Sequence, residues 1–216
     1  MEPIPLGTWN GKALSVTIEI DKQMVTANVT DNLADMSMTL PNPRTREGGF
    51  LHTFYVNPRK VNTSVRGYKG LGKAMLCAVV NKLIQDGRLQ STDEIELEAS
   101  GGNCSKEDQM AIDKPTEEIQ AFLGTYEGLL ESIRDYYRDT EGREEPVVLN
   151  REDILDTYCN VLANQKLVAY YKTFGFKPIA GQDHGWVTGM KGSVSGILKA
   201  CVPTGGKKTR RRRVRK

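Results

Sequence analysis

The sequence has few of the residues that form metal sites. Its 216 residues include two histidines and four cysteines, and no two cysteines stand in a Cys-x-x-Cys pair. A zinc site therefore has no ligand set at the usual spacing, and we expect no metal. Widely scattered cysteines favour free thiols in a reducing compartment. The four are Cys77, Cys104, Cys159 and Cys201.

Long apolar segments are also missing. No apolar run reaches the ~18–20 residues that a membrane-spanning helix needs. The first residues, Met1 to Leu6, lack the basic and apolar regions of a signal peptide. We therefore expect an intracellular protein, cytoplasmic or nuclear, with no membrane contact. A chain of this length can bury one sizeable core, which predicts one domain that carries an insertion and a tail.

The charge is distributed unevenly along the chain. The formal net charge is +3, yet residues 207–216 alone hold eight Lys or Arg and no acid, and the rest has 22 basic and 27 acidic residues. This tail has no aromatic residue that would stack on bases. It is typical of a segment for a nuclear import receptor or of an arm that binds nucleic acid without sequence preference. We expect residues 191–216 to form a flexible basic tail.

Hydrophobic periodicity predicts strands before the first helix. Apolar and polar residues alternate over 15–20, 25–29 and 36–40, which favours an antiparallel meander with one buried face. Residues 50–56 are apolar enough for a central strand. A helical stripe runs from Leu71 to Leu83 and is stopped by Asp86-Gly87, and residues 94–99 alternate again. This order predicts a crossover between neighbouring parallel strands.

Residues 103–160 interrupt this pattern and are strongly acidic. Between Ser105 and Thr157 there are 15 acidic and 6 basic residues. One apolar face from Ile119 to Tyr137 predicts a helix of about 22 residues opened at Pro115, and Asn150 is a candidate cap for another. We interpret this part as an acidic helical insertion that attracts a cationic acceptor, or as an ordinary solvated helix surface. A further helix is expected over 163–174, followed by strands at 176–179 and 186–190.

The glycine-rich stretch after the central strand fits several kinds of site. Gly67 to Lys73 has the spacing of a P-loop, but the next residue, Ala74, lacks the hydroxyl that would hold magnesium. A dinucleotide fingerprint has its glycines in the opposite order. A turn that only permits close helix–strand packing is a third interpretation. A strand, glycine turn and helix start otherwise cradle phosphate, because backbone N–H groups converge there.

Two separate stretches carry a family resemblance. A strand ending Val56-Asn-Pro58 precedes Gly67-Tyr-Lys-Gly-Leu-Gly72, and Asn164 is followed by Tyr171 and then by Gly175-Phe176. In this order they resemble motifs A and B of the GNAT superfamily of acyl-CoA N-acyltransferases, over about 50–100 and 161–190. The chain departs from the family's pattern in three ways: it has glycine at position 67 in place of Gln or Arg, although Arg66 is adjacent; it has a longer loop over 58–66; and no two-helix segment follows the first strand.

The resemblance implies a fold and a cofactor. The fold is an α+β domain over 1–190, with a mixed, mostly antiparallel sheet, flanking helices and central parallel strands that splay apart. The cofactor is acetyl-CoA, used as a co-substrate, with its pyrophosphate on the N–H groups at the helix start. The residues implied to bind it are Tyr55, Val56, Arg66, Gly67, Tyr68, Lys69, Gly70, Leu71, Gly72, Lys73 and Asn164.

The resemblance also implies catalytic roles. Tyr171 would be the general acid that protonates the departing thiolate, because a phenol of pKa near ~10 stays protonated at neutral pH; otherwise it is a tyrosine packed at a helix end. Tyr170 lies ~100° further round the helix and should not share this role. The incoming amine needs a base, for which Glu96 is the first candidate and Glu98 and His52 are alternatives. Glutamates that alternate on a strand otherwise form its solvated face.

These features together predict an N-acetyltransferase. The acceptor would be a primary, cationic amine: a polyamine, an aminoglycoside, a lysine side chain or a protein N-terminus. It would attack acetyl-CoA directly, with no protein nucleophile. The alternative is an inactive acyl-CoA-binding module of the same fold, tethered to nucleic acid or a protein partner by the basic tail, which could also fold back onto the acidic insertion.

Overall fold

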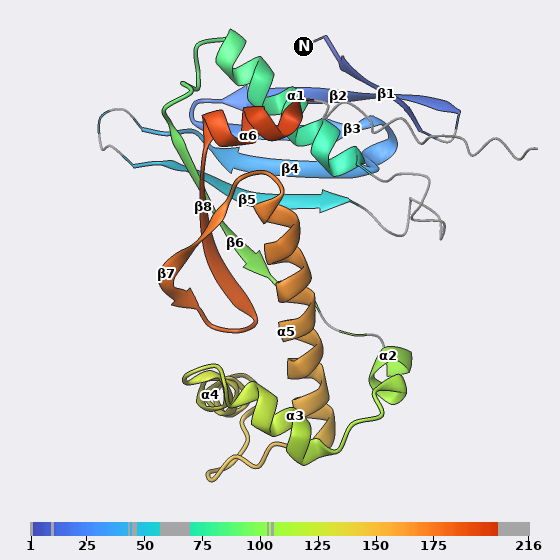
Figure 1. The fold of residues 1–216 in the computed structure, drawn as a ribbon, viewed down its shortest axis with the longest axis vertical. Helices are drawn as coiled ribbons and strands as arrows, with labels where there is room; N and C mark the ends of the chain where they lie inside the picture. The colour runs from blue at the N-terminus through green and yellow to red at the C-terminus, as the bar shows by residue number, and fades with distance from the viewer. Residues whose placement is uncertain are drawn as a thin grey trace, which may run out of the picture.

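The computed structural model describes residues 2–9, 11–42, 44, 47–56, 70–102, 104 and 106–202, which form an α+β structure around one eight-stranded sheet (Figure 1). The strands are β1 (Ile4–Trp9), β2 (Lys12–Asp21), β3 (Met24–Val29), β4 (Ala34–Thr39), β5 (Gly49–Val56), β6 (Glu94–Ser100), β7 (Lys177–Asp183) and β8 (Val187–Ser193). The helices are the short 3-10 turn η1 (Thr30–Asn32) and α1 (Leu71–Gln85), α2 (Lys106–Ala111), α3 (Thr116–Leu123), α4 (Leu129–Glu141), α5 (Arg151–Lys172) and α6 (Val194–Cys201).

The sheet is mixed and mostly antiparallel, as the sequence predicts. Its strand order is β1-β2-β3-β4-β5-β6-β8-β7, and only β5 and β6 pair in parallel. The meander predicted between residues 15 and 40 is confirmed, because β2, β3 and β4 pair antiparallel and their buried apolar residues alternate with more exposed, mostly polar ones. The parallel pair joined by α1 is the predicted crossover.

The two parallel strands form a fork at the centre of the sheet. They pair at three positions, Gly49 with Ile95, Phe50 with Glu96 and Leu51 with Leu97. Beyond these pairs β5 continues to Val56 and β6 to Ser100, and the two strands diverge (Figure 1).

A bulge in β5 lies at the base of this fork. Met38 of β4 pairs with Leu51, whereas the preceding Ser37 pairs with Thr53, so His52 is an extra residue in β5. The extra residue shifts the side-chain alternation of the strand and bends it at this point. The bulge therefore sits where β5 leaves β6.

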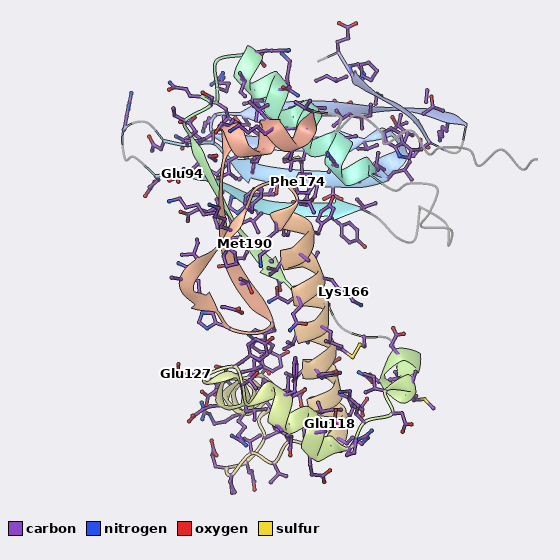
Figure 2. The ribbon with its side chains drawn as sticks, viewed as in Figure 1. Glu94, Glu118, Glu127, Lys166, Phe174 and Met190 are labelled. Carbon is purple, nitrogen blue, oxygen red and sulfur yellow. A yellow bond between two sulfur atoms is a disulfide. The ribbon has the colours of Figure 1, made fainter. Side chains whose placement is uncertain are left out.

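The main core lies between the sheet and the helices α1, α6 and the last turns of α5. It joins apolar residues of β2 to β6 and β8 with the buried face of α1 and with Tyr171, Phe174 and Phe176. Figure 1 shows α1 and α6 lying across the meander, and Phe174 marks the contact of α5 with the sheet in Figure 2. The glycine at position 175 has φ 87°, which ends α5 and turns the chain into β7.

The insertion folds into a second apolar cluster that differs from the prediction. The expected helix over 116–137 is two helices, α3 and α4, because the chain turns between Gly124 and Gly128. Gly128 has φ 70°, a left-handed backbone conformation that breaks a helix. Residues of α3, α4 and the first half of α5 form this cluster. Figure 1 shows α3, α4 and the first half of α5 below the sheet.

The two helices predicted around 150–174 are one continuous helix. Asn150 does cap it, since its side chain accepts a hydrogen bond of 3.0 Å from the Asp153 backbone N–H. The helix then runs unbroken through residue 160, the predicted end of the insertion. The insertion is therefore joined to the main domain by α5 itself.

The chain beyond residue 191 is ordered further than expected. Residues 191–193 complete β8, and α6 packs on α1 with Val194 and Ile197 fully buried, so the predicted flexible tail cannot begin at 191. Residues 203–216, with the basic cluster, lie outside the described part of the chain.

The prediction of free thiols is wrong. Cys77 pairs with Cys201, which joins α1 to α6, and Cys104 pairs with Cys159 in α5 (Figure 2). Disulfides persist in oxidising compartments, so cysteine usage no longer supports the expected reducing one. In the part of the chain that is described, no helix is long and apolar enough to cross a bilayer.

Candidate functional site

The beginning of α1, the end of β5 and the end of α5 meet at one place. A Cβ atom built on Gly72 would lie 2.9 Å from the hydroxyl oxygen of Tyr170, 3.2 Å from Cζ of Phe54 and 3.4 Å from Cγ2 of Val56. The Phe54 ring lies 6.2 Å from the Tyr170 ring and 6.1 Å from the Tyr171 ring, between centroids. The two stretches that carry the family resemblance are therefore in contact.

The start of α1 presents N–H donors that have no acceptor within the helix. Gly70 precedes the helix with φ 86° and gives no side-chain cap. The first intrahelical bond runs from Ala74 N–H to the Gly70 carbonyl, at 2.9 Å. The N–H groups of Leu71, Gly72 and Lys73 therefore have no intrahelical acceptor.

Local structure also explains two of the glycines. Gly70 adopts a left-handed backbone that side chains disfavour, and Gly72 has no room for a side chain. The packing interpretation of the glycine turn thus accounts for Gly72. Leu71 is one of the predicted binding residues, but its side chain is fully buried in the core and serves packing.

Several predicted cofactor residues cannot be placed. The residues Arg66, Gly67, Tyr68 and Lys69 lie outside the described residues, as does the whole stretch 57–69. Tyr55 is described and is half exposed near the end of β5, where it pairs with Asp35 of β4.

The fork leaves one edge of β5 without a described strand partner. Pairing with β6 stops at Leu51, while β5 continues to Val56. Backbone N–H and C=O groups along such an edge can pair with an extended ligand. This edge leads directly to the start of α1.

Tyr171 is buried in this junction. Its side chain is 7% exposed and its ring packs against Phe54 and, at 6.0 Å between centroids, Phe176. Its hydroxyl has no hydrogen bond within the described ranges. Burial raises the pKa of Tyr171, which keeps the phenol protonated at neutral pH.

Tyr170 is the more accessible tyrosine. It is 37% exposed, and its ring is stacked at 19° on Phe54 and meets Phe174 edge-on at 5.0 Å. Burial raises its pKa to about 12. The sequence predicts no catalytic role for Tyr170, because Tyr170 lies ~100° round the helix from Tyr171. A helical wheel does not show that this flank of α5 contacts α1.

Asn164 connects α5 to the turn between β7 and β8 by hydrogen bonds. It is fully buried, and its side-chain amide donates to the Gly185 carbonyl at 2.8 Å and to Thr188 Oγ1 at 3.0 Å. Thr188 in turn donates to Asp183 at 3.1 Å. Asn164 therefore joins α5 to the turn between β7 and β8, and its described hydrogen bonds are structural.

Glu96 lies at the closed end of the fork. It pairs in register with Phe50, four residues before Phe54, which is ~13 Å along the strand. Lys191 Nζ lies 3.5 Å from Glu96 and 2.8 Å from Glu94, and the hydrogen bond with Glu94 is the main cause that raises the Lys191 pKa. The structure does not bring Glu96 to the tyrosines.

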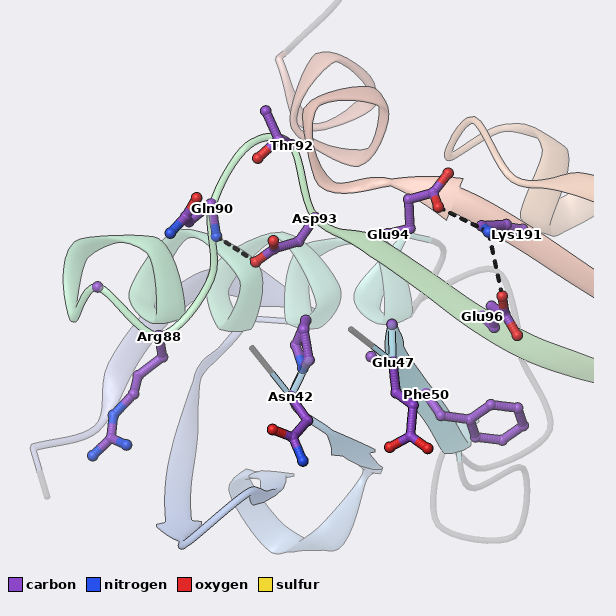
Figure 3. Close-up of a pocket in the computed structure, with 14 residues that line it drawn as sticks. Asn42, Glu47, Phe50, Arg88, Gln90, Thr92, Asp93, Glu94, Glu96 and Lys191 are labelled. Atoms are coloured by element: carbon purple, nitrogen blue, oxygen red, sulfur yellow. Dashed lines mark hydrogen bonds and ion pairs between the residues drawn. The ribbon is translucent and has the colours of Figure 1, made fainter. Parts of the chain in front are cut away.

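Glu96 lines a cavity of about 680 Å³ (Figure 3). It is formed by the segments before β5, before β6 and in β8. Its charged side chains are Glu47, Arg88, Asp93, Glu94, Glu96 and Lys191. The alternative bases lie apart from this ion pair: His52 Nε2 is 2.6 Å from Thr39 Oγ1, and Glu98 is exposed further along β6.

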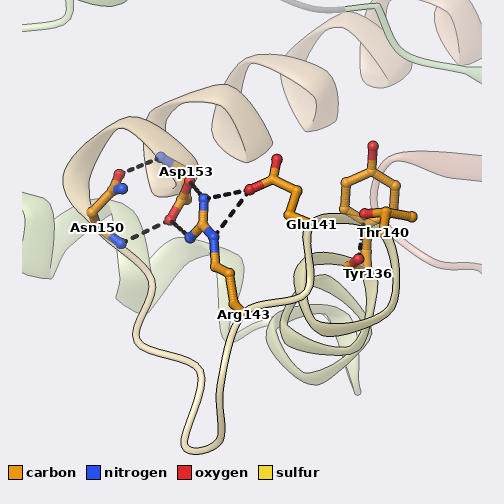
Figure 4. A network of polar contacts seen from close by, with 6 residues as sticks. All are labelled: Tyr136, Thr140, Glu141, Arg143, Asn150 and Asp153. Atoms are coloured by element: carbon orange, nitrogen blue, oxygen red, sulfur yellow. Dashed lines mark hydrogen bonds and ion pairs between the residues drawn. The ribbon is translucent and has the colours of Figure 1, made fainter.

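A second polar cluster holds the insertion together. Arg143 donates to both carboxylate oxygens of Asp153, at 2.6 and 3.0 Å, and lies 2.9 Å from Glu141 (Figure 4). Its guanidinium also lies 3.9 Å from the Tyr137 ring centroid. Burial would raise the pKa of Asp153, but the hydrogen bonds from Arg143 and from the Asn150 backbone outweigh it and lower that pKa. Part of the acidity of the insertion is therefore neutralised internally.

No group of three or more His, Cys, Asp or Glu side chains within the described ranges is arranged to hold a metal ion. Comparisons with protein-family models, with curated proteins and with solved structures find no match to this chain. A functional conclusion therefore depends on the geometry of the junction between β5, α1 and α5.

Proposed function

We propose that the protein is an N-acetyltransferase that moves an acetyl group from acetyl-CoA to a primary, cationic amine. One observation carries the proposal: the unpaired edge of β5 leads to an α1 start whose N–H groups have no intrahelical acceptor, and a buried tyrosine at the end of α5 adjoins both. The junction thus combines an edge for an extended amide chain, donors for phosphate and a proton donor.

The residues present suit acetyl-CoA in two respects. The pantetheine arm, which has amide groups, would pair with β5 near Tyr55 and Val56. The pyrophosphate would accept from the N–H groups of Gly72 and Lys73, with the Lys73 ammonium as a further charge partner.

The reaction needs a proton donor and a base. The neutral amine attacks the thioester carbonyl carbon, and backbone N–H groups at the fork would stabilise the resulting oxyanion. The carbon–sulfur bond then breaks, and Tyr171 would give its proton to the departing thiolate. The incoming ammonium loses two protons in all. One leaves through a base or a water chain before the attack, and the second leaves the nitrogen of the tetrahedral intermediate and restores the proton that Tyr171 gave. Glu96 is ion-paired at the closed end of the fork. Glu98 on β6 and His52 on β5 are therefore the alternative candidates for this base.

Charge supports a cationic acceptor. The carboxylates of β6, Glu94, Glu96 and Glu98, all lie on the sheet face away from the main core. Lys191 pairs with Glu94 and Glu96, so the three carboxylates and one ammonium leave an excess of negative charge on this face. Negative charge of this kind attracts cations.

One observation favours a second candidate, an acyl-CoA-binding module without turnover. Tyr171 is 7% exposed and tightly packed by rings, so the same side chain would be a core residue in a protein that binds the cofactor only. The basic residues 207–216 would then tether the module to nucleic acid or a protein partner.

A single assay separates these candidates. The full-length protein is incubated with acetyl-CoA and a panel of amines, including spermidine, an aminoglycoside and a lysine-rich peptide, while free CoA thiol and acetylated product are measured. Product formation supports the enzyme. Stabilisation by CoA in a thermal shift without product supports the binding module, and the absence of both removes the two candidates together.

A further inference from the structure

The Tyr170 hydroxyl occupies a defined position at the site. It lies 2.9 Å from where a Gly72 Cβ would be, which places it against the first turn of α1. The ring cannot easily swing away, because Phe54 stacks on it and Phe174 meets it edge-on. Any side chain at position 72 would displace this hydroxyl.

The hydroxyl also lacks a partner. Tyr170 makes no side-chain hydrogen bond with any residue in the described ranges, although the side chain is more than half buried. The first turn of α1, which this hydroxyl contacts at Gly72, offers further donors and no described acceptor. These donors are the backbone N–H groups of Leu71, Gly72 and Lys73. The phenol O–H donates one hydrogen bond, and the described residues supply no acceptor for it.

We infer that Tyr170 is a cofactor-contacting residue, whose hydroxyl donates a hydrogen bond to an acceptor oxygen of acetyl-CoA at the first turn of α1. The inference rests on the proposed function. It assigns the two adjacent tyrosines different tasks: Tyr170 binds the cofactor, and Tyr171 acts on the thiolate. It also gives Gly72 a reason beyond helix packing, since only glycine leaves the hydroxyl in place.

The direct test compares coenzyme A binding by the full-length wild type and by Tyr170→Phe, using calorimetry. Phenylalanine keeps the stacking on Phe54 and loses only the hydroxyl, so the Kd should rise about tenfold. In turnover, the KM for acetyl-CoA should rise while kcat changes by less than about twofold, because the contact is made equally in the ground and transition states. Tyr136→Phe, an exposed tyrosine of α4, is the matched control and should leave both unchanged.

Gly72→Ala provides an independent arm. Its methyl group would collide with the hydroxyl, so it should also weaken coenzyme A binding. In Gly72→Ala/Tyr170→Phe the collision with the hydroxyl is removed, while Phe54 Cζ would still lie 3.2 Å from the new methyl group, so the double variant should recover part of the binding that Gly72→Ala loses. Circular dichroism identifies any variant that fails to fold. If one of Tyr170→Phe and Gly72→Ala fails to fold, coenzyme A binding by the other variant tests the inference.

The outcomes separate the inference from the proposed function. If the wild type does not bind coenzyme A, the proposed function fails and the inference with it. If the wild type binds and Tyr170→Phe, or a folded Gly72→Ala, binds equally well, the inference alone is overturned.

Discussion

Arg143 holds Asp153 by two parallel hydrogen bonds, and Asp153 also accepts the backbone N–H of Asn150 at 2.9 Å. Asp153 is 5% exposed and lies in the first turn of α5, while the arginine comes from the segment after α4. This one side chain therefore closes the capping box and joins two elements of the insertion.

Asp153→Asn should destabilise the protein. The amide is nearly isosteric but carries no charge for Arg143, and it cannot accept at both positions. We expect Tm to fall by on the order of 5 °C in calorimetry. Asp139→Asn, at an exposed partner of Arg138, is the control and should shift Tm little. Equal Tm shifts in the two variants would show that the Arg143–Asp153 pair stabilises the protein no more than an exposed ion pair does.

The same pair predicts a pH dependence. The pKa of Asp153 is lowered in the folded protein, so the folded state binds the proton less tightly than the unfolded state. Its contribution is therefore complete above the unfolded pKa of ~3.9 and is lost as pH falls through the folded pKa. Urea midpoints of wild type and Asp153→Asn should differ at pH 6 and converge below about pH 3. A difference that stays constant down to pH 2 would contradict the assignment.

Local patterns explain which parts of the fold the sequence could reveal. The meander and the parallel crossover follow from alternation and helical stripes within single segments, and both are confirmed. The break between α3 and α4 was missed because the apolar face stays in phase across the turn, while the glycines at 124 and 128 were the available signal.

The sequence contains a start signal for helix α6, although the composition of this region suggests disorder. Ser193 caps α6 by accepting from the Gly196 backbone N–H at 3.1 Å, and Val194 and Ile197 are buried one turn apart. Small residues nearby suggested disorder, yet serine followed by this spacing is typical of a helix start.

The site was only partly accessible to sequence reasoning. The order of motifs located the tyrosines and glycines, but a face on a helical wheel does not show what the neighbouring flank will touch. The contact of Tyr170 with Gly72 depends on how α5 enters beside the fork, which only the tertiary structure determines. The position of Glu96 likewise depended on strand register, which fixes its pairing with Phe50.

Thiol titration tests the disulfides directly. Protein unfolded without reductant should show no free thiol, because all four cysteines are paired in the structure. Reduction should lower stability, most through Cys77–Cys201, which closes a loop with a sequence separation of 124. For a loop of that length the expected loss is about 5 kcal/mol, measured as a shift of the urea midpoint. Four titratable thiols in freshly purified protein would show that the pairs do not form.

Tyr171→Phe tests the acid role under the proposed function. Removing the hydroxyl leaves the ring contacts with Phe54 and Phe176, so folding and coenzyme A affinity should change little, while kcat should fall ~10²-fold or more. Because burial raises the Tyr171 pKa, the acid stays protonated through neutral pH, and wild-type kcat should decline only above about pH 10. Tyr170→Phe is the internal comparison, since it should raise KM and spare kcat. If Tyr171→Phe turns over as fast as the wild type, another donor protonates the thiolate, even in a protein that proves to be an acetyltransferase.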